Sequence, residues 1–322
     1  MLASTQSVFV LWCSMALVAL TWFGIVFIGF VIFSPSGLTG IWALLQRRWR
    51  RPSPVPDALW QDTVAQHGFL AALPVPDQAR LRELCAHFLA EKEFHGAHGL
   101  NVTDTMALSI AVQACLPLLG MCLPGGHPPR RPCDLLDWYG DFVGIVVQPG
   151  AVLARREVRD ASGVVHQYTE ALAGEAMDGG PLMLSWEDVA AAGEVAERGH
   201  NLVIHEFVHK IDMHDIALGD QPGGSPPLPR GFLGHARGAE ASAHWQRVMR
   251  EAFARFTEAV SLAERFGGET PWLDDYAAHS PAEFFAVTCE AYFVSRERFG
   301  AEFPELVPLY DGLFQAAVSR PR

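Results

Sequence analysis

The apolar residues of segment 76–92 recur every three or four positions, a spacing that places them on one face of an α-helix. Further apolar runs, bounded by capping or turn residues, predict four more helices, over residues 103–119, 201–213, 241–266 and 281–294. Thr103 is the expected N-terminal cap of the first of these.

Strand-like sequence begins in the middle of the chain, in FVGIVVQP (142–149) and VVHQYTEAL (164–172). GGPLMLSWEDV (179–189) predicts a turn, a short strand and then a helix capped by Ser185. GDQPGGSPPLPRG (219–231) is rich in proline and glycine and predicts a surface loop. A few strands followed by helices predict a single α+β domain.

The N-terminal segment has a different pattern, because residues 8–33 contain no charged side chain. That length of apolar chain can span a bilayer as a tilted helix. A cleaved signal peptide usually has basic residues ahead of a shorter apolar core, whereas residues 1–7 here carry no charge. We therefore expect a single, retained transmembrane helix.

Four arginines follow this span, at positions 47, 48, 50 and 51. Basic residues close to a membrane span mark its cytoplasmic end, so we expect a single-pass protein of the inner membrane whose remaining chain faces the cytoplasm. Residues 1–51 would then form a membrane anchor with a basic flank. The proline-rich residues 52–60 would form a tether to the body of the protein.

Charge and cysteine content agree with a cytoplasmic body that does not bind nucleic acid. The whole chain has a formal net charge of −12, and the four arginines are the only charged residues of the anchor, so the body is more acidic still. Such a surface repels nucleic acid. The six cysteines show no CxxC spacing, which indicates free thiols in a reducing compartment.

The stretch NLVIHEFVHKID (201–212) carries the strongest chemical signal. Helical spacing places His205 and His209 on one face, where both imidazoles can bind one metal ion. Glu206 would stand beside the metal, placed to take a proton from a bound water. The alternative is an ordinary core helix, but unpartnered polar groups among so many apolar neighbours are costly, and a metal would offset that cost.

A catalytic zinc usually has three protein ligands and one open position. In DDYAAHSPAEFFAVTCEAYF (274–293), Glu283 and Glu290 are seven residues apart and share one helical face. Glu283 is a candidate ligand, but it also completes a Ser-x-x-Glu capping box with Ser280. His279 is another possible ligand. The spacing leaves these alternatives open.

Four stretches together resemble the MtfA-type zinc peptidases (the Mlc titration factor A family), whose catalytic core is similar to that of anthrax lethal factor. They are WYGDFVGIVVQP (138–149), GPLMLSWEDV (180–189), GHNLVIHEFVHKID (199–212) and the stretch 274–293. The resemblance implies a zincin-like zinc peptidase domain over residues 61–322, of α+β class, preceded by the single N-terminal transmembrane helix. It also implies a possible partner, because some members are described as binding a sugar-responsive transcriptional repressor.

Position by position, the resemblance implies Zn²⁺ held by His205, His209 and Glu283, with Glu206 as the general base. Tyr276 lies seven residues before Glu283, the spacing at which lethal factor has a tyrosine that assists catalysis. Its hydroxyl would donate to the developing oxyanion, or the residue is simply a packed tyrosine.

Three further features have two interpretations each. Asp212 could accept the outer N–H of a ligand imidazole, or be a solvated acid at a helix end. Glu290 could orient a ligand or pair with a buried cation, and a structural role is favoured. The strand made by Pro181, Leu182, Met183 and Leu184 could be an edge on which a substrate peptide adds as a further strand, or simply part of the sheet.

We therefore expect a membrane-anchored metallopeptidase that cleaves a peptide or protein substrate with a zinc-activated water. The alternative is a metal-containing regulatory protein that captures a transcriptional repressor or another cytoplasmic partner. Glu206 favours the enzyme, because a structural metal site has no need of an unliganded carboxylate beside the metal.

Overall fold

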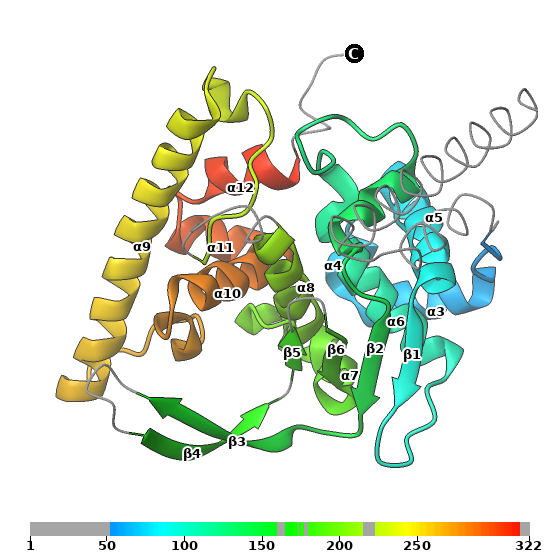
Figure 1. Ribbon diagram of the computed structural model, residues 1–322, viewed down its shortest axis with the longest axis horizontal. Coiled ribbons are helices and arrows are strands. Elements are labelled where there is room, and N and C mark those ends of the chain that lie inside the picture. Colours follow the sequence, from blue (N-terminus) through cyan, green and yellow to red (C-terminus); the bar gives the residue numbers. More distant parts are fainter. Residues whose placement is uncertain (1–51, 160–164, 173, 177–179, 215–222, 316–322) are drawn as a thin grey trace, which may run out of the picture. The chain divides into compact units, whose positions relative to one another are not determined.

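The computed structural model describes residues 52–315, except for 160–164, 173, 177–179 and 215–222 (Figure 1). The chain divides into two compact units, Met1–Arg51 and Pro52–Arg322. The expected membrane anchor belongs to the first unit and lies outside the described residues. Among the helices of the described part, none combines the length and apolar character needed to cross a bilayer.

Helices make up most of the second unit. The α-helices are α3 (Asp57–Gln66), α4 (Gly68–Ala71), α5 (Val75–Glu91), α6 (Asp104–Cys115), α7 (Trp186–Val195), α8 (Leu202–Asp212), α9 (Gly238–Phe266), α10 (Pro281–Val294), α11 (Arg296–Glu302) and α12 (Val307–Phe314). Short 3₁₀ helices include η1 (Pro117–Gly120), η2 (Pro132–Tyr139), η3 (Ala196–Arg198), η5 (Phe232–Gly234) and η6 (Asp275–Ala278). The six helices expected from the sequence correspond to α5, α6, α7, α8, α9 and α10.

Local capping explains where several of these helices begin. The Thr103 hydroxyl accepts the Met106 N–H at 3.3 Å and starts α6, as predicted. Ser185 caps α7 in the same way, by accepting the Asp188 N–H. These side chains satisfy backbone donors that have no partner inside the helix.

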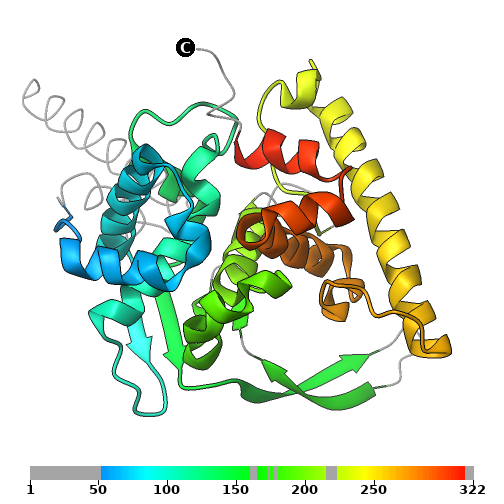
Figure 2. The same ribbon diagram turned by 180° about the vertical axis from the view of Figure 1, so that it is seen from behind.

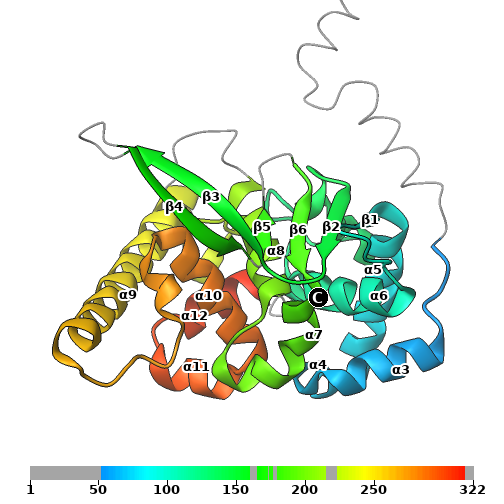
Figure 3. The ribbon, with the colours of Figure 1, turned by 90° about the horizontal axis from the view of Figure 1, so that it is seen from below.

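The strands form two sheets. They are β1 (Glu93–Gly96), β2 (Gly144–Gln148), β3 (Val152–Arg159), β4 (Val165–Leu172), β5 (Gly174–Ala176) and β6 (Leu182–Ser185). The main sheet has the order β1-β2-β6-β5, in which only the β5–β6 pair is antiparallel (Figure 3). β3 and β4 form a separate antiparallel pair. The strands expected at 142–149, 164–172 and within 179–189 correspond to β2, β4 and β6, whereas β1, β3 and β5 were not expected.

One face of the main sheet belongs to the core. Ile145 of β2 pairs with Leu182 of β6, and Val147 pairs with Leu184. All four side chains are fully buried. The helix α8 contacts α6 on one side and α10 on the other, so it lies at the centre of the helical packing (Figure 2).

The predicted tether is shorter than expected. Residues 52–60 were interpreted as a proline-rich linker, but α3 begins at Asp57, directly after Pro56. Trp60 is only 7% exposed and belongs to the core. The proline that suggested a linker therefore precedes a helix, and burial of the tryptophan holds that helix against the body.

Candidate metal centre

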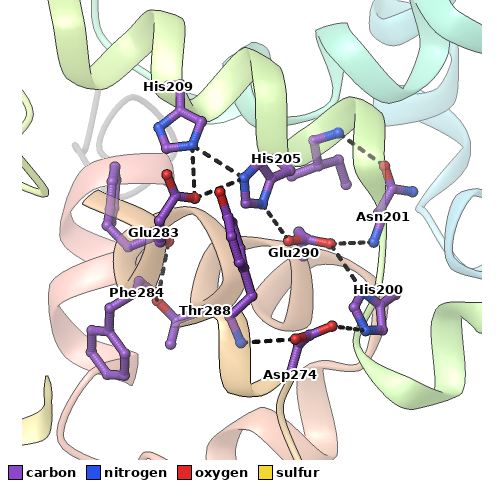
Figure 4. A network of polar contacts seen from close by, with 12 residues as sticks. His200, Asn201, His205, His209, Asp274, Glu283, Phe284, Thr288 and Glu290 are labelled. Carbon is purple, nitrogen blue, oxygen red and sulfur yellow. Dashed lines mark hydrogen bonds and ion pairs between the residues drawn. The ribbon is translucent and has the colours of Figure 1, made fainter. Parts of the chain in front are cut away.

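The helix α8 carries the HExxH stretch. Asn201 caps it, because its side-chain oxygen accepts the Ile204 N–H at 2.9 Å. The apolar residues of α8 are buried and fix its rotation about its own axis: Val203, Ile204, Phe207, Val208 and Ile211. His205 and His209, one turn apart, are only partly buried and face α10 (Figure 4).

The helix α10 supplies Glu283 from its first turn. The Ser280 hydroxyl accepts the Glu283 N–H at 3.2 Å, so Ser280 does cap the helix. The Glu283 carboxylate, however, points to the two histidines. Only half of the predicted capping box is formed, because the carboxylate that would complete it faces the two histidines.

The three side chains converge on one point. Glu283 Oε2 lies 3.1 Å from His205 Nε2 and 3.2 Å from His209 Nε2, and the two Nε2 atoms are 3.1 Å apart (Figure 4). Ligand atoms around a tetrahedral zinc, each about 2.0–2.1 Å from the metal, stand roughly 3.3 Å apart. The triangle therefore has the size that a zinc ion requires. It is the one group of three possible ligands found among the described residues, and His279 is not part of it.

Glu290 fixes the orientation of His205. Its Oε1 lies 2.7 Å from His205 Nδ1, and its Oε2 accepts the backbone N–H of Asn201. Glu290 is 3% exposed. A proton shared with this carboxylate occupies Nδ1 and leaves the Nε2 lone pair directed at the point where the three side chains meet. Of the two roles considered for Glu290, the structure shows a contact with a candidate ligand.

The electrostatics of the centre favour a cation. Burial tends to lower the pKa of His205, but its contacts with Glu283 and Glu290 outweigh burial and hold that pKa well above its usual value. Burial tends to raise the pKa of Glu283, but the two imidazoles hold it far below the usual value. A positive charge is thus stabilised where the three ligand atoms meet.

Glu206 lies beside this group without being part of it. Its side chain is 5% exposed and has no hydrogen-bond or ion-pair partner within the described part of the chain. Burial raises the pKa of its carboxyl, while the two histidines lower it. A buried carboxylate with no protein partner is suited to accept a proton.

Tyr276 lies next to the candidate ligands. Its ring centroid is 6.2 Å from that of His205 and 5.0 Å from that of His279. The residue belongs to η6, which Asp274 caps by accepting the Tyr276 N–H at 2.8 Å. The chain from η6 into α10 thus places the Tyr276 ring beside His205. Its predicted part in catalysis remains a prediction.

Two residues of the same network were missed by the sequence analysis. His200 Nε2 lies 3.0 Å from Asp274 Oδ2, and His200 Nδ1 lies 3.8 Å from Glu290 Oε2 (Figure 4). His200 and Asp274 thereby connect the turn that carries Tyr276 to the carboxylate that orients His205. The contact between His200 and Asp274 spans far separated parts of the chain, and no local spacing indicates it.

The structure contradicts both interpretations of Asp212. Its carboxylate accepts the Gly224 N–H at 2.6 Å rather than an imidazole N–H. It is 6% exposed, so it is not a solvated acid either. The imidazole-orienting contact is made by Glu290 instead.

The predicted substrate edge is also wrong. Pro181 precedes β6, and Leu182, Met183 and Leu184 lie within it. β6 pairs with β2 on one side and with β5 on the other, so both of its edges are occupied. Among the described strands, β5 ends the sheet on this side, and it packs against α8.

Two histidines on one helix, a glutamate from a later helix and a small mixed sheet together define a zincin-like metallopeptidase fold. The sequence model of the family "Glucose-regulated metallo-peptidase M90" matches residues 42–315, and the chain belongs to this family. The resemblance inferred from the four stretches is thus confirmed at the level of the family.

Proteins named Mlc titration factor A are similar to this chain. The one from Salmonella arizonae is 30% identical over 250 residues, which cover 78% of this chain and 87% of its own length. Those from Enterobacter sp. strain 638 and Escherichia fergusonii are 28% and 29% identical, over 80% and 77% of this chain and over 86% and 82% of their own lengths.

Proposed function

We propose that this protein is a zinc-dependent peptidase in which His205, His209 and Glu283 hold the metal. The observation that carries the proposal is the triangle of ligand atoms, 3.1 to 3.2 Å on each side, with the buried carboxylate of Glu206 next to it, which no described residue hydrogen-bonds. Two imidazoles and one carboxylate are a usual ligand set of catalytic zinc, and they leave one position open.

The residues of the centre divide the chemistry among them. When bound, zinc would supply a Lewis acid that polarises the scissile carbonyl and lowers the pKa of water. Glu206 takes the proton of the attacking water and delivers it to the leaving amine. The Tyr276 hydroxyl donates a hydrogen bond to the oxygen that becomes negative in the transition state. Glu290 holds the His205 ring in place through Nδ1.

Removal of the metal tests this proposal. Full-length protein, purified in detergent, is incubated with a library of peptides with free and with blocked N-termini. We expect cleavage that stops with a zinc chelator and returns when zinc is added, because the proposed reaction depends on the bound metal. Cleavage that continues in the chelator after the zinc content has fallen to zero would contradict a metal-dependent reaction.

A second candidate function rests on the name of the relatives. The relatives are called Mlc titration factor A. As the alternative, we propose that this chain binds a transcriptional repressor or another regulatory protein in the cytoplasm. Glu206 distinguishes the two candidates, because binding does not require a base beside the metal. If the Glu206→Gln variant binds a partner and the unaltered protein cleaves no peptide, the regulatory function is correct.

The position of the protein in the cell is a separate proposal. We propose a single N-terminal transmembrane helix within residues 8–33, with the peptidase domain in the cytoplasm, because four arginines follow the uncharged span. Fusions made after residue 60 test this. A cytoplasmic reporter is expected to be active and alkaline phosphatase inactive, and the reverse result would invert the orientation.

A further inference from the structure

Residues Gly223, Gly224 and Ser225, called here the glycine strap, belong to the loop predicted from the Pro/Gly-rich stretch 219–231. Asp212, the last residue of α8, accepts the Gly224 N–H at 2.6 Å. The Gly224 carbonyl in turn accepts the indole N–H of Trp245 in α9 at 2.8 Å. The strap is thus tied to the helix that carries both histidines and to the long helix α9.

The strap also lies directly on the first turn of α10. A Cβ atom added to Gly223 would stand 2.8 Å from the Ala282 Cβ, and one added to Gly224 would stand 2.5 Å from the Pro281 carbonyl oxygen. Gly224 also has a φ of +78°, which favours glycine. The close backbone approach is therefore possible only without side chains at these two positions.

The contact point on α10 matters for the metal site, because Ala282 directly precedes Glu283. A shift of the first turn of α10 moves the Glu283 backbone with it. The three ligand atoms are within 3.1 to 3.2 Å of one another, so a displacement of a few tenths of an ångström changes the size of the triangle. The second histidine, His209, is fixed on the opposite helix, one turn before Asp212.

Asp212 is buried at the point where α8 ends and the glycine strap contacts it. Its side chain is 6% exposed, and an ionised carboxylate in such a place is stable only when it is well hydrogen-bonded. Its hydrogen bond to the strap supplies that partner. The cost of losing this bond keeps the strap attached to the end of α8.

We propose that the glycine strap is a positioning element for the metal centre, and that Asp212 is a positioning residue that acts through it. The strap sets the separation between the end of α8 and the first turn of α10. In this way it keeps the Glu283 carboxylate at the distance from the two histidines that metal binding requires. This inference rests on the proposed zinc site. It assigns a function in metal binding to residues that touch neither metal nor substrate.

Gly223→Ala tests the inference without changing any ligand. Its methyl group would push against Ala282 and displace the first turn of α10, so we expect zinc affinity of the full-length protein to fall at least about tenfold, the lower end of the usual effect of residues that support metal ligands. Competition with a chromophoric zinc chelator measures the affinity. Adding Ala282→Gly removes the opposing methyl group and is expected to restore it.

Gly231→Ala is the matched control. Gly231 has a φ of +72°, but a Cβ there would meet nothing within 4 Å. We expect this variant to show the strain of an alanine at positive φ as a lower melting temperature, with zinc affinity unchanged. A loss of affinity in Gly223→Ala but not in Gly231→Ala therefore reports the contact with α10 and not general instability.

The results separate the two proposals. If the unaltered protein binds no zinc, the proposed function is wrong, and this inference fails with it. If the unaltered protein binds zinc and Gly223→Ala binds it equally well, only the positioning role is wrong. The same conclusion follows if affinity is lost in Gly223→Ala and Ala282→Gly does not recover it.

Discussion

Glu206→Gln is expected to lower peptide turnover by about 10²–10⁴-fold while zinc stays bound, because general acid–base catalysis typically contributes that much. Glutamine has nearly the size and shape of glutamate, but its amide does not accept a proton. The residue is buried and makes no hydrogen bond to another described residue, so the substitution removes no hydrogen bond within the described part of the chain. Steady-state kinetics with zinc content measured in parallel checks both parts of the expectation.

Glu197→Gln is the control for this variant. Glu197 is an exposed acid in η3, shortly before α8, and its substitution likewise replaces a carboxylate by an amide. We expect the turnover of the Glu197→Gln variant to equal that of the unaltered protein. A fully active Glu206→Gln enzyme with normal zinc content would exclude Glu206 as the base and with it the peptidase mechanism proposed above.

The residues of the candidate metal centre were predictable to the extent that their geometry is local. His205, Glu206 and His209 lie within five residues of one helix, and helical geometry alone places them together. Glu283 is different, because its position depends on how α10 packs against α8. Spacing left it undecided between ligand and cap, and the structure shows that its backbone serves the cap while its carboxylate faces the histidines.

The contacts around the centre could not be read from the sequence. Glu290 and Asp212 were both candidates for supporting an imidazole, and nothing local distinguishes them. Glu290 reaches His205 because both helices present these residues at their mutual contact, whereas Asp212 lies at the end of α8, where the glycine strap meets it. Such contacts depend on how distant segments pack against each other, and the sequence of one segment does not reveal this.

The helices were predicted better than the strands for a related reason. Thr103, Ser185 and Ser280 mark helix starts by hydrogen bonds to residues three positions later, so the signal is contained in a few residues. β5 has only three residues, and its pairing with β6 defines it. A strand of that kind has no hydrophobic alternation of its own, so the sequence could not decide whether β6 is an edge or an inner strand of the sheet.

Tyr276→Phe is the second large effect that we expect. Loss of an oxyanion donor typically costs about 10²–10³ in kcat. The hydroxyl would meet a charge that is present in the transition state and absent from the bound substrate, so KM should change little. The position of the ring, 6.2 Å from that of His205, motivates this expectation. Kinetics on any peptide that the enzyme accepts, with zinc content measured in parallel, provides the test.

Tyr292→Phe provides a matched comparison, because it removes a hydroxyl from a tyrosine of α10. That hydroxyl donates to Asp311 at 2.8 Å, and neither residue belongs to the metal centre. We expect the Tyr292 variant to lose stability and to keep its kcat, since a partly buried hydrogen bond is lost without a change near the ligands. The Tyr276 variant should instead lose kcat. If its kcat is unchanged, Tyr276 only packs against the histidines, and stabilisation of the oxyanion must come from another group.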